Sequence, residues 1–281
     1  MSTFMHAGWN LLARSQQQRD IFLSVLLVVA VVAVGPALWA EWGAVPVLTA
    51  VYPLLLLTAG FESLYYFGLL RGYQSGDFTV VYPVARSLPV LMLALVDFGR
   101  GQPPSPWGWL GMVLISLGCL LIPLHHWQDF SWGHYWQPMM GWALLAAWGT
   151  VGYTLVDKAA AAQLAPGWQT AVRYVSLMYP LTAVGYWLTL KLLKRPIHAL
   201  PSRRSWPIVL LAAACMFGAY ALILWVYQLT EKVSYIVALR QFSIVLGVII
   251  GAVIFREPAP RWRIAMSLLI VTGITLIAVW G

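Results

Sequence analysis

The chain has 281 residues, of which 61% are hydrophobic and only 9% are charged. A soluble domain carries roughly 25% charged residues, so this composition excludes an ordinary water-soluble globular protein. The formal net charge is +8. Most lysines and arginines fall between apolar runs, where they indicate membrane topology rather than an anionic partner. We therefore expect a multi-pass membrane protein that binds no nucleic acid.

Apolar stretches of membrane-spanning length recur along the chain. The first residues, 1–13, are apolar, but at about 1.5 Å per residue they cover only about 20 Å of a hydrocarbon core about 30 Å thick. Full-length spans are predicted at 21–40, 46–70, 78–97, 106–124, 139–157, 167–190, 206–229, 233–255 and 262–280. The sequence therefore predicts an all-α polytopic membrane protein with about ten transmembrane helices, the first of them short.

The second half of the chain resembles the first. A shift of 155 residues aligns 77–122 with 232–277 without a gap. The matched pairs include Pro103 with Pro258, Trp107 with Trp262, and Gly118 with Gly273. This register predicts two five-helix repeats, 1–124 and 139–281. Because five is odd, the second repeat is inverted relative to the first, an arrangement typical of secondary transporters.

Positive charges are unequally distributed among the segments that connect the predicted spans. The segments after the first, third, seventh and ninth spans carry 11 lysines and arginines, whereas those after the fourth, sixth and eighth carry only Arg100, Lys158 and Lys232. The positive-inside rule then places the first set in the cytoplasm and, with ten spans, both termini outside.

Few ionisable residues fall inside the apolar runs. They are His6, Glu62, Arg86, Arg173 and Arg240, and the uncharged polar residues Asn10 and Gln241 accompany them. A charged group is costly to place in lipid, so each of these side chains is expected to face a polar cavity or a polar partner.

Arg86 and Arg240 lie on equivalent helices of the two repeats, and the 155-residue register aligns Arg86 with Gln241. Two guanidinium groups near the midplane form a candidate clamp for a carboxylate or phosphonate, because the planar fork pairs bidentately with such groups. The alternative is a structural pairing with a carboxylate or with helix carbonyls. Pro83 and Pro89 bracket Arg86 and are expected to kink its helix.

Tyrosines accompany both kinds of charged group. Tyr82 lies one helical turn before Arg86, and Tyr66 lies one turn after Glu62. We expect the two tyrosines to pack against the organic part of a substrate. Glu62 either binds and releases a proton during transport or neutralises Arg86, and the sequence leaves both interpretations open.

His6 and Asn10 share one face of the short first helix with Trp9. They are candidates for substrate contact, and a helix-packing hydrogen bond is the alternative. The motifs of nucleophilic hydrolases, phosphate-binding loops, zinc proteases and dinucleotide-binding folds do not occur in the chain. We therefore expect no enzymatic activity, no cofactor and no bound metal.

Three local motifs carry a resemblance to a known family. HAGWNLLAR at 6–14 resembles an HAxWNxxxK helix ending, GDFTVVYPVARS at 76–87 resembles GDLSxVYPLARG, and FREPAPRW at 255–262 resembles a Glu-Pro turn. All three occur in EamA-type ten-span members of the drug/metabolite transporter superfamily, and the likeness covers essentially the whole chain. One branch includes proteins encoded with phosphonate-utilisation genes. The resemblance implies secondary transport by alternating access.

We thus expect a transporter in the bacterial cytoplasmic membrane, surrounded by lipid, that moves a small polar, anionic metabolite through a cavity between the repeats. An amino-acid or drug exporter is the alternative substrate interpretation. A polytopic enzyme acting on a lipid-linked anion is the alternative activity. The expected substrate contacts are Arg86, Arg240, Tyr82, Tyr66, Gln241, His6 and Asn10, with Glu62 as a candidate proton site.

Overall fold

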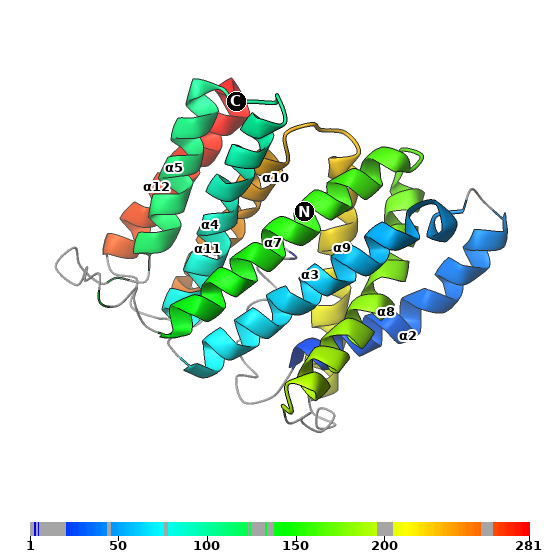
Figure 1. Ribbon diagram of the computed structural model, residues 1–281. Coiled ribbons are helices and arrows are strands. Elements are labelled where there is room, and N and C mark those ends of the chain that lie inside the picture. Colours follow the sequence, from blue (N-terminus) through cyan, green and yellow to red (C-terminus); the bar gives the residue numbers. More distant parts are fainter. Residues whose placement is uncertain are drawn as a thin grey trace. The chain divides into compact units, whose positions relative to one another are not determined.

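A computed structural model of the protein describes residues 3, 5, 21–43, 46–75, 78–122, 124, 133, 138–195, 205–253 and 261–281. These residues form helices and connecting segments, with no β-strand among them (Figure 1). The helices longer than one turn are α2 (Ile21–Gly43), α3 (Leu48–Ser75), α4 (Phe78–Gly99), α5 (Pro106–Leu121), α7 (Pro138–Gln163), α8 (Trp168–Leu192), α9 (Trp206–Tyr227), α10 (Val233–Arg240), α11 (Phe242–Val253) and α12 (Arg261–Trp280). An all-α fold is therefore confirmed.

Every predicted full-length span coincides with one helix, except that 233–255 contains two, α10 and α11. Among the described residues, six helical stretches are long and apolar enough to cross a membrane: Phe22–Gly43, Leu48–Gly72, Met139–Gln163, Trp206–Tyr227, Val233–Ile250 and Arg261–Trp280. Helix α5 is also apolar, but its 16 residues make it shorter. The structure thus supports a polytopic helical membrane protein, with six such stretches in the described part of the chain, and the ten expected spans stay a prediction. Most of 1–13 lies outside the described residues.

The chain divides into two compact units. Unit 1 contains Met1–Phe67 and Gly152–Thr230, and unit 2 contains Gly68–Val151 and Glu231–Gly281. Unit 1 therefore holds α2, α8, α9 and parts of α3 and α7, whereas unit 2 holds the other parts of α3 and α7 together with α4, α5, α10, α11 and α12. Each unit takes helices from both predicted repeats.

In unit 2, helices α5 and α12 lie side by side and antiparallel (Figure 1). The hydroxyl of Ser105, at the start of α5, donates to the carbonyl of Trp280 at the end of α12 (3.0 Å). The indole N–H of Trp262, at the start of α12, donates to the carbonyl of Leu121 at the end of α5 (2.8 Å). These are equivalent helices in the predicted repeat, and an inverted repeat requires them to run in opposite directions.

Glycines allow α5 and α12 to approach closely. A Cβ atom added to Gly111 would lie 2.6 Å from the carbonyl oxygen of Gly273, and a Cβ atom added to Gly273 would lie 2.5 Å from the carbonyl oxygen of Gly111. Backbone atoms cannot rotate away as a side chain can, so any larger residue would push the helices apart. Small residues at membrane helix interfaces commonly have this role.

Helix α4 runs from Phe78 to Gly99 and contains Pro83 and Pro89, and the kink expected there stays a prediction. The predicted helix 233–255 is interrupted at Gln241, where α10 ends and α11 begins. A helix break without proline persists only where other groups satisfy the interrupted backbone hydrogen bonds. In this chain, side chains from α4, from the break itself and from α11 supply those hydrogen bonds.

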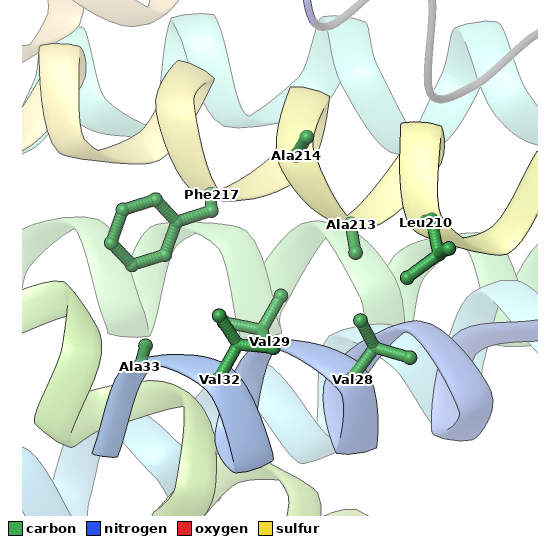
Figure 2. Close-up of a pocket in the computed structure, with 8 residues that line it drawn as sticks. All are labelled: Val28, Val29, Val32, Ala33, Leu210, Ala213, Ala214 and Phe217. Atoms are coloured by element: carbon green, nitrogen blue, oxygen red, sulfur yellow. The ribbon is translucent and has the colours of Figure 1, made fainter. Parts of the chain in front are cut away.

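In unit 1, α2 packs against α8 and α9, and α8 packs against α9. A groove of about 250 Å³ lies between α2 and α9, and Figure 2 shows the residues that line it. Its lining is entirely apolar: Val28, Val29, Val32, Ala33, Leu210, Ala213, Ala214 and Phe217. No candidate substrate residue is in this lining, so the groove does not supply polar contacts to a metabolite.

Candidate functional site

Arg86 lies against the break between α10 and α11 in unit 2. Its Nε donates to Oε1 of Gln241 (3.2 Å), and its Nη2 donates to the carbonyl of Arg240 (3.4 Å) and to Oγ of Ser243 (3.3 Å). In return, Nε2 of Gln241 donates to the carbonyls of Arg86 (3.1 Å) and Val237 (3.0 Å). The two residues aligned by the 155-residue register are therefore in direct, reciprocal contact.

This contact explains how the helix can break inside an apolar segment. Arg240 is the last residue of α10, so its carbonyl lacks a full set of helical partners, and both Arg86 and the hydroxyl of Ser243 donate to it. The side chains of Arg86, Arg240 and Gln241 are buried, with exposed fractions of 6%, 5% and 1%. Ser243 is in the first turn of α11, whose N-terminus carries partial positive charge. The two guanidinium groups thus place positive charge at the break.

Asp97, which was not among the predicted site residues, binds the other end of α10. It is a buried residue of α4, and its Oδ2 accepts a hydrogen bond from the backbone N–H of Ser234 in the first turn of α10 (2.9 Å). A carboxylate at a helix N-terminus is favourable because it offsets the positive end of the helix. Two side chains of α4, Arg86 and Asp97, therefore bind opposite ends of α10.

A second polar cluster lies within unit 1 and contains two buried carboxylates. Oε2 of Glu62 on α3 accepts a hydrogen bond from the hydroxyl of Thr182 on α8 (3.0 Å). Oδ1 of Asp157 on α7 accepts from the phenol of Tyr174 (2.7 Å), and Oδ2 accepts from the phenol of Tyr220. Glu62 and Asp157 are 2% and 0% exposed. Only Glu62 was predicted, because Asp157 is the last residue of its predicted span.

Tyr66 belongs to an aromatic cluster in the same unit. Its ring centroid lies 5.1 Å from that of Tyr65, 5.4 Å from Phe22 and 6.0 Å from Tyr186. Its hydroxyl donates to Sδ of Met216 (3.4 Å). Tyr66 is buried within unit 1, so the predicted residues Glu62 and Tyr66 share one cluster.

The assignment of Lys158 to a loop was wrong. Helix α7 continues to Gln163, and Lys158 is a buried residue within it. Its Nζ donates to the carbonyls of Tyr227 (3.0 Å) and Thr230 (2.6 Å) at the end of α9. The ammonium thus satisfies carbonyls that a helix end leaves without intrahelical partners. Lys158 should therefore not be counted among the loop charges that predict topology.

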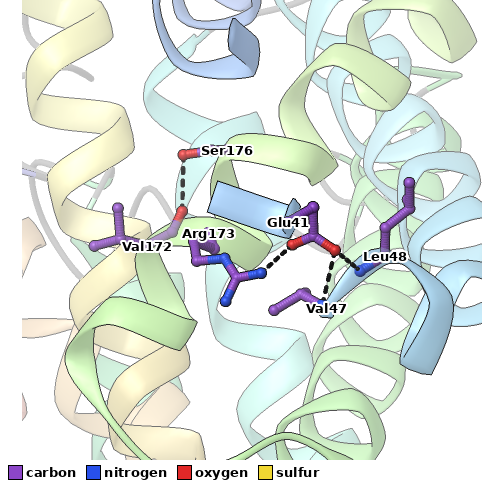
Figure 3. A network of polar contacts seen from close by, with 6 residues as sticks. All are labelled: Glu41, Val47, Leu48, Val172, Arg173 and Ser176. Carbon is purple, nitrogen blue, oxygen red and sulfur yellow. Dashed lines mark hydrogen bonds and ion pairs between the residues drawn. The ribbon is translucent and has the colours of Figure 1, made fainter. Parts of the chain in front are cut away.

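Arg173 is another of the ionisable residues inside the apolar runs. Its Nη2 forms an ion pair with Oε1 of Glu41 (Figure 3). Oε2 of Glu41 accepts from the backbone N–H groups of Val47 and Leu48, both at 2.9 Å. Glu41 is near the end of α2, and Leu48 is the first residue of α3. One carboxylate therefore links α8 to the start of α3, which is a structural role.

Replacing Glu41 with glutamine is expected to lower the free energy of unfolding by about 1 to 2 kcal/mol, because the amide keeps an acceptor for the backbone but loses the partly buried ion pair. Thermal unfolding of the purified protein in detergent measures the effect. Glu41→Gln combined with Arg173→Gln should be little worse than either single variant, since both remove the same interaction. Simple additivity of the two effects would contradict the pairing.

The predicted substrate residues are thus found in two places. Arg86, Arg240 and Gln241 meet in unit 2, whereas Glu62 and Tyr66 lie in unit 1. Tyr82 is part of α4, but its side chain lies outside the described part of the chain, as do His6 and Asn10.

No protein-family profile and no curated protein matches this sequence. Twenty-five solved chains are similar in structure. One of them, a protein solved by crystallography, aligns with a TM-score of 0.74 and 18% sequence identity, over 98% of this chain and 93% of its own length. At this identity the likeness shows a shared fold.

Proposed function

We propose that the protein is a secondary transporter of a small anionic metabolite in the cytoplasmic membrane of a bacterium. The observation that carries this proposal is the helix break at Gln241, where Arg86, Arg240 and the N-terminus of α11 come together. Transporters bind substrates at interrupted membrane helices, and the N-terminal ends of half-helices attract anionic groups. Two buried guanidinium groups beside such an end favour a carboxylate, phosphate or phosphonate.

The two arginines have different roles in this proposal. Arg86 holds the break together through Gln241 and Ser243 and supplies positive charge to it. Arg240, the last residue of α10, is the proposed direct contact to the substrate. The motifs at 76–87 and 255–262 support membership of the EamA-type transporters, and alternating access is the mechanism that this membership implies. Tyr82, on α4 of the same unit, remains a proposed substrate contact.

Ligand-induced thermal stabilisation tests the proposal. Purified protein in detergent is heated with phosphonates, phosphorylated metabolites, carboxylates, cationic drugs or no ligand. A ligand at 100 times its Kd stabilises the folded state by about 2.7 kcal/mol. We expect one class of anion to stabilise the protein and Arg240→Gln to weaken its binding at least about tenfold, equivalent to about 1.4 kcal/mol.

The matched control is Arg100→Gln, which removes an exposed arginine from the same unit and should leave binding unchanged. An anion that binds is then tested in proteoliposomes, where a transporter moves it across the membrane without altering it. Chemical conversion of the anion would instead indicate an enzyme. Stabilisation by cationic drugs alone, with no response to any anion, would refute the proposed substrate class.

A further inference from the structure

We propose that the end of α8 carries a binding site for an anionic phospholipid, whose headgroup is held by Lys191, Lys194 and Arg195. Helix α8 coincides with the predicted span 167–190, so its end is expected at a membrane surface. These residues belong to unit 1, whereas the helix break at Gln241 belongs to unit 2. The proposal does not rest on the transport function.

The three cations are exposed and lack carboxylate partners. In the part of the chain that the structure describes, no carboxylate forms an ion pair with Lys191, Lys194 or Arg195. The sequence contains no aspartate or glutamate between Asp157 and Glu231. Positive charge that is not neutralised within the protein attracts an anionic partner, and basic clusters beside a membrane helix attract anionic lipids.

The end of α8 does not need these side chains as caps. The backbone N–H of Lys194 donates to the carbonyl of Lys191 (3.0 Å), and the backbone N–H of Arg195 donates to the carbonyl of Leu190 (2.8 Å). Lysine and arginine side chains near a helix C-terminus often satisfy such carbonyls. Here the backbone satisfies them, so capping does not account for the three charges.

Lys194 occupies a backbone conformation that favours glycine. Its φ is 50°, and among the described residues it is the one non-glycine residue with a positive φ. Glycine is the usual residue at this position after a helix, because a Cβ atom disfavours the left-handed conformation. Local strain of this kind points to a functional requirement. We infer that the requirement is the charge, which glycine would not supply.

An exposed apolar stripe of α8 leads to the cations. Val184, Trp187, Leu188 and Leu192 are all exposed, and with Lys191 they have the spacing of one helix face. The ammonium of Lys191 lies 4.3 Å from the ring centroid of Trp187, a cation–π contact that keeps the charge at the end of the stripe. A surface that is apolar along its length and positive at its end fits a lipid with acyl chains and an anionic headgroup.

Lipid binding to the full-length protein in uncharged detergent tests the proposal. Native mass spectrometry measures the affinity for phosphatidylglycerol, and phosphatidylcholine with the same acyl chains is the reference. We expect the wild-type protein to prefer phosphatidylglycerol. Each lysine or arginine near an anionic lipid surface contributes about fivefold in affinity, so Lys191→Gln combined with Arg195→Gln should weaken phosphatidylglycerol binding about 25-fold. Binding of phosphatidylcholine should not change.

Lys194→Gly separates lipid binding from folding. Glycine favours the left-handed backbone at this position, so the unfolding temperature without lipid should stay the same or rise. The affinity for phosphatidylglycerol should nevertheless fall about fivefold, because one charge is lost. The matched control is Arg261→Gln, which removes an exposed arginine at the start of α12, predicted on the same side of the membrane. It should leave the lipid preference unchanged.

Two further measurements test the apolar part of the site. Trp187→Ala should weaken the binding of both lipids, because it removes apolar contact area. Inorganic phosphate at the lipid concentration should not compete, because it has no acyl chain.

Three results would overturn the proposal. They are equal affinity of the wild-type protein for the two lipids, an unchanged lipid preference in the Lys191→Gln and Arg195→Gln double variant, and competition by inorganic phosphate. No transport substrate is present in these measurements, so their result is independent of the proposed function.

Discussion

Replacing Arg86 with methionine is expected to lower the free energy of unfolding by about 3 kcal/mol, the largest effect that we predict for a single polar side chain. Methionine fills similar space but leaves Oε1 of Gln241, the carbonyl of Arg240 and Oγ of Ser243 without the guanidinium donor. These groups are buried at the helix break, where water does not replace the lost hydrogen bonds. Thermal and denaturant unfolding in detergent measure the loss.

Two further variants identify the cause. Arg86→Lys retains the charge but not the planar fork, so it should recover only part of the stability. Arg86→Met combined with Gln241→Leu should be less destabilised than the sum of the single variants by about 1 to 2 kcal/mol, since the partners are removed together. Full stability of Arg86→Lys, or strict additivity, would show that charge alone or packing alone accounts for the role of Arg86.

Replacing Gly111 with alanine is expected to destabilise unit 2 by about 2 to 3 kcal/mol, because overpacking a close helix interface forces the backbones apart. The added methyl group would meet the carbonyl oxygen of Gly273 at 2.6 Å, and Ile277 also lies within contact distance. Gly273→Ala should have a similar effect for the reciprocal reason. Unfolding temperatures in detergent provide the measurement.

Gly60→Ala is the matched control. Gly60 lies within α3, and an added Cβ atom would have no heavy atom within 4 Å. Alanine is a better helix former than glycine by up to about 1 kcal/mol, so this variant should be neutral or slightly more stable. If Gly111→Ala were as stable as Gly60→Ala, the close approach of α5 and α12 would not be the feature that excludes a side chain.

The positions of the helices were predictable from the sequence because they depend on local composition. A run of about 20 apolar residues forms a helix in a membrane, where every backbone polar group must be satisfied within the segment. The ends were predicted less well. Asp157 and Lys158 look like the end of a span, yet α7 continues to Gln163 because both charged groups have buried partners on other helices.

The contact between Arg86 and Gln241 was not predicted, although the 155-residue register aligns the two as equivalent positions. Equivalent positions of two repeats need not touch, so the register alone does not imply the hydrogen bonds. The break at Gln241 itself has no local signal such as proline, because it depends on donors that α4 supplies. Asp97 and Glu41 were missed for the same reason, because their partners lie far along the chain. Asp97 binds the backbone N–H of Ser234, and Glu41 binds the side chain of Arg173.

The sequence by itself therefore determined that this is a helical membrane protein and where its apolar helices lie. Hydrophobicity and length act locally, so one segment suffices to predict them. Only the tertiary structure decided where a helix breaks and which carboxylates are buried. Charged groups survive in an apolar interior only with hydrogen-bond partners, and for Asp157 those partners are Tyr174 and Tyr220 on two other helices.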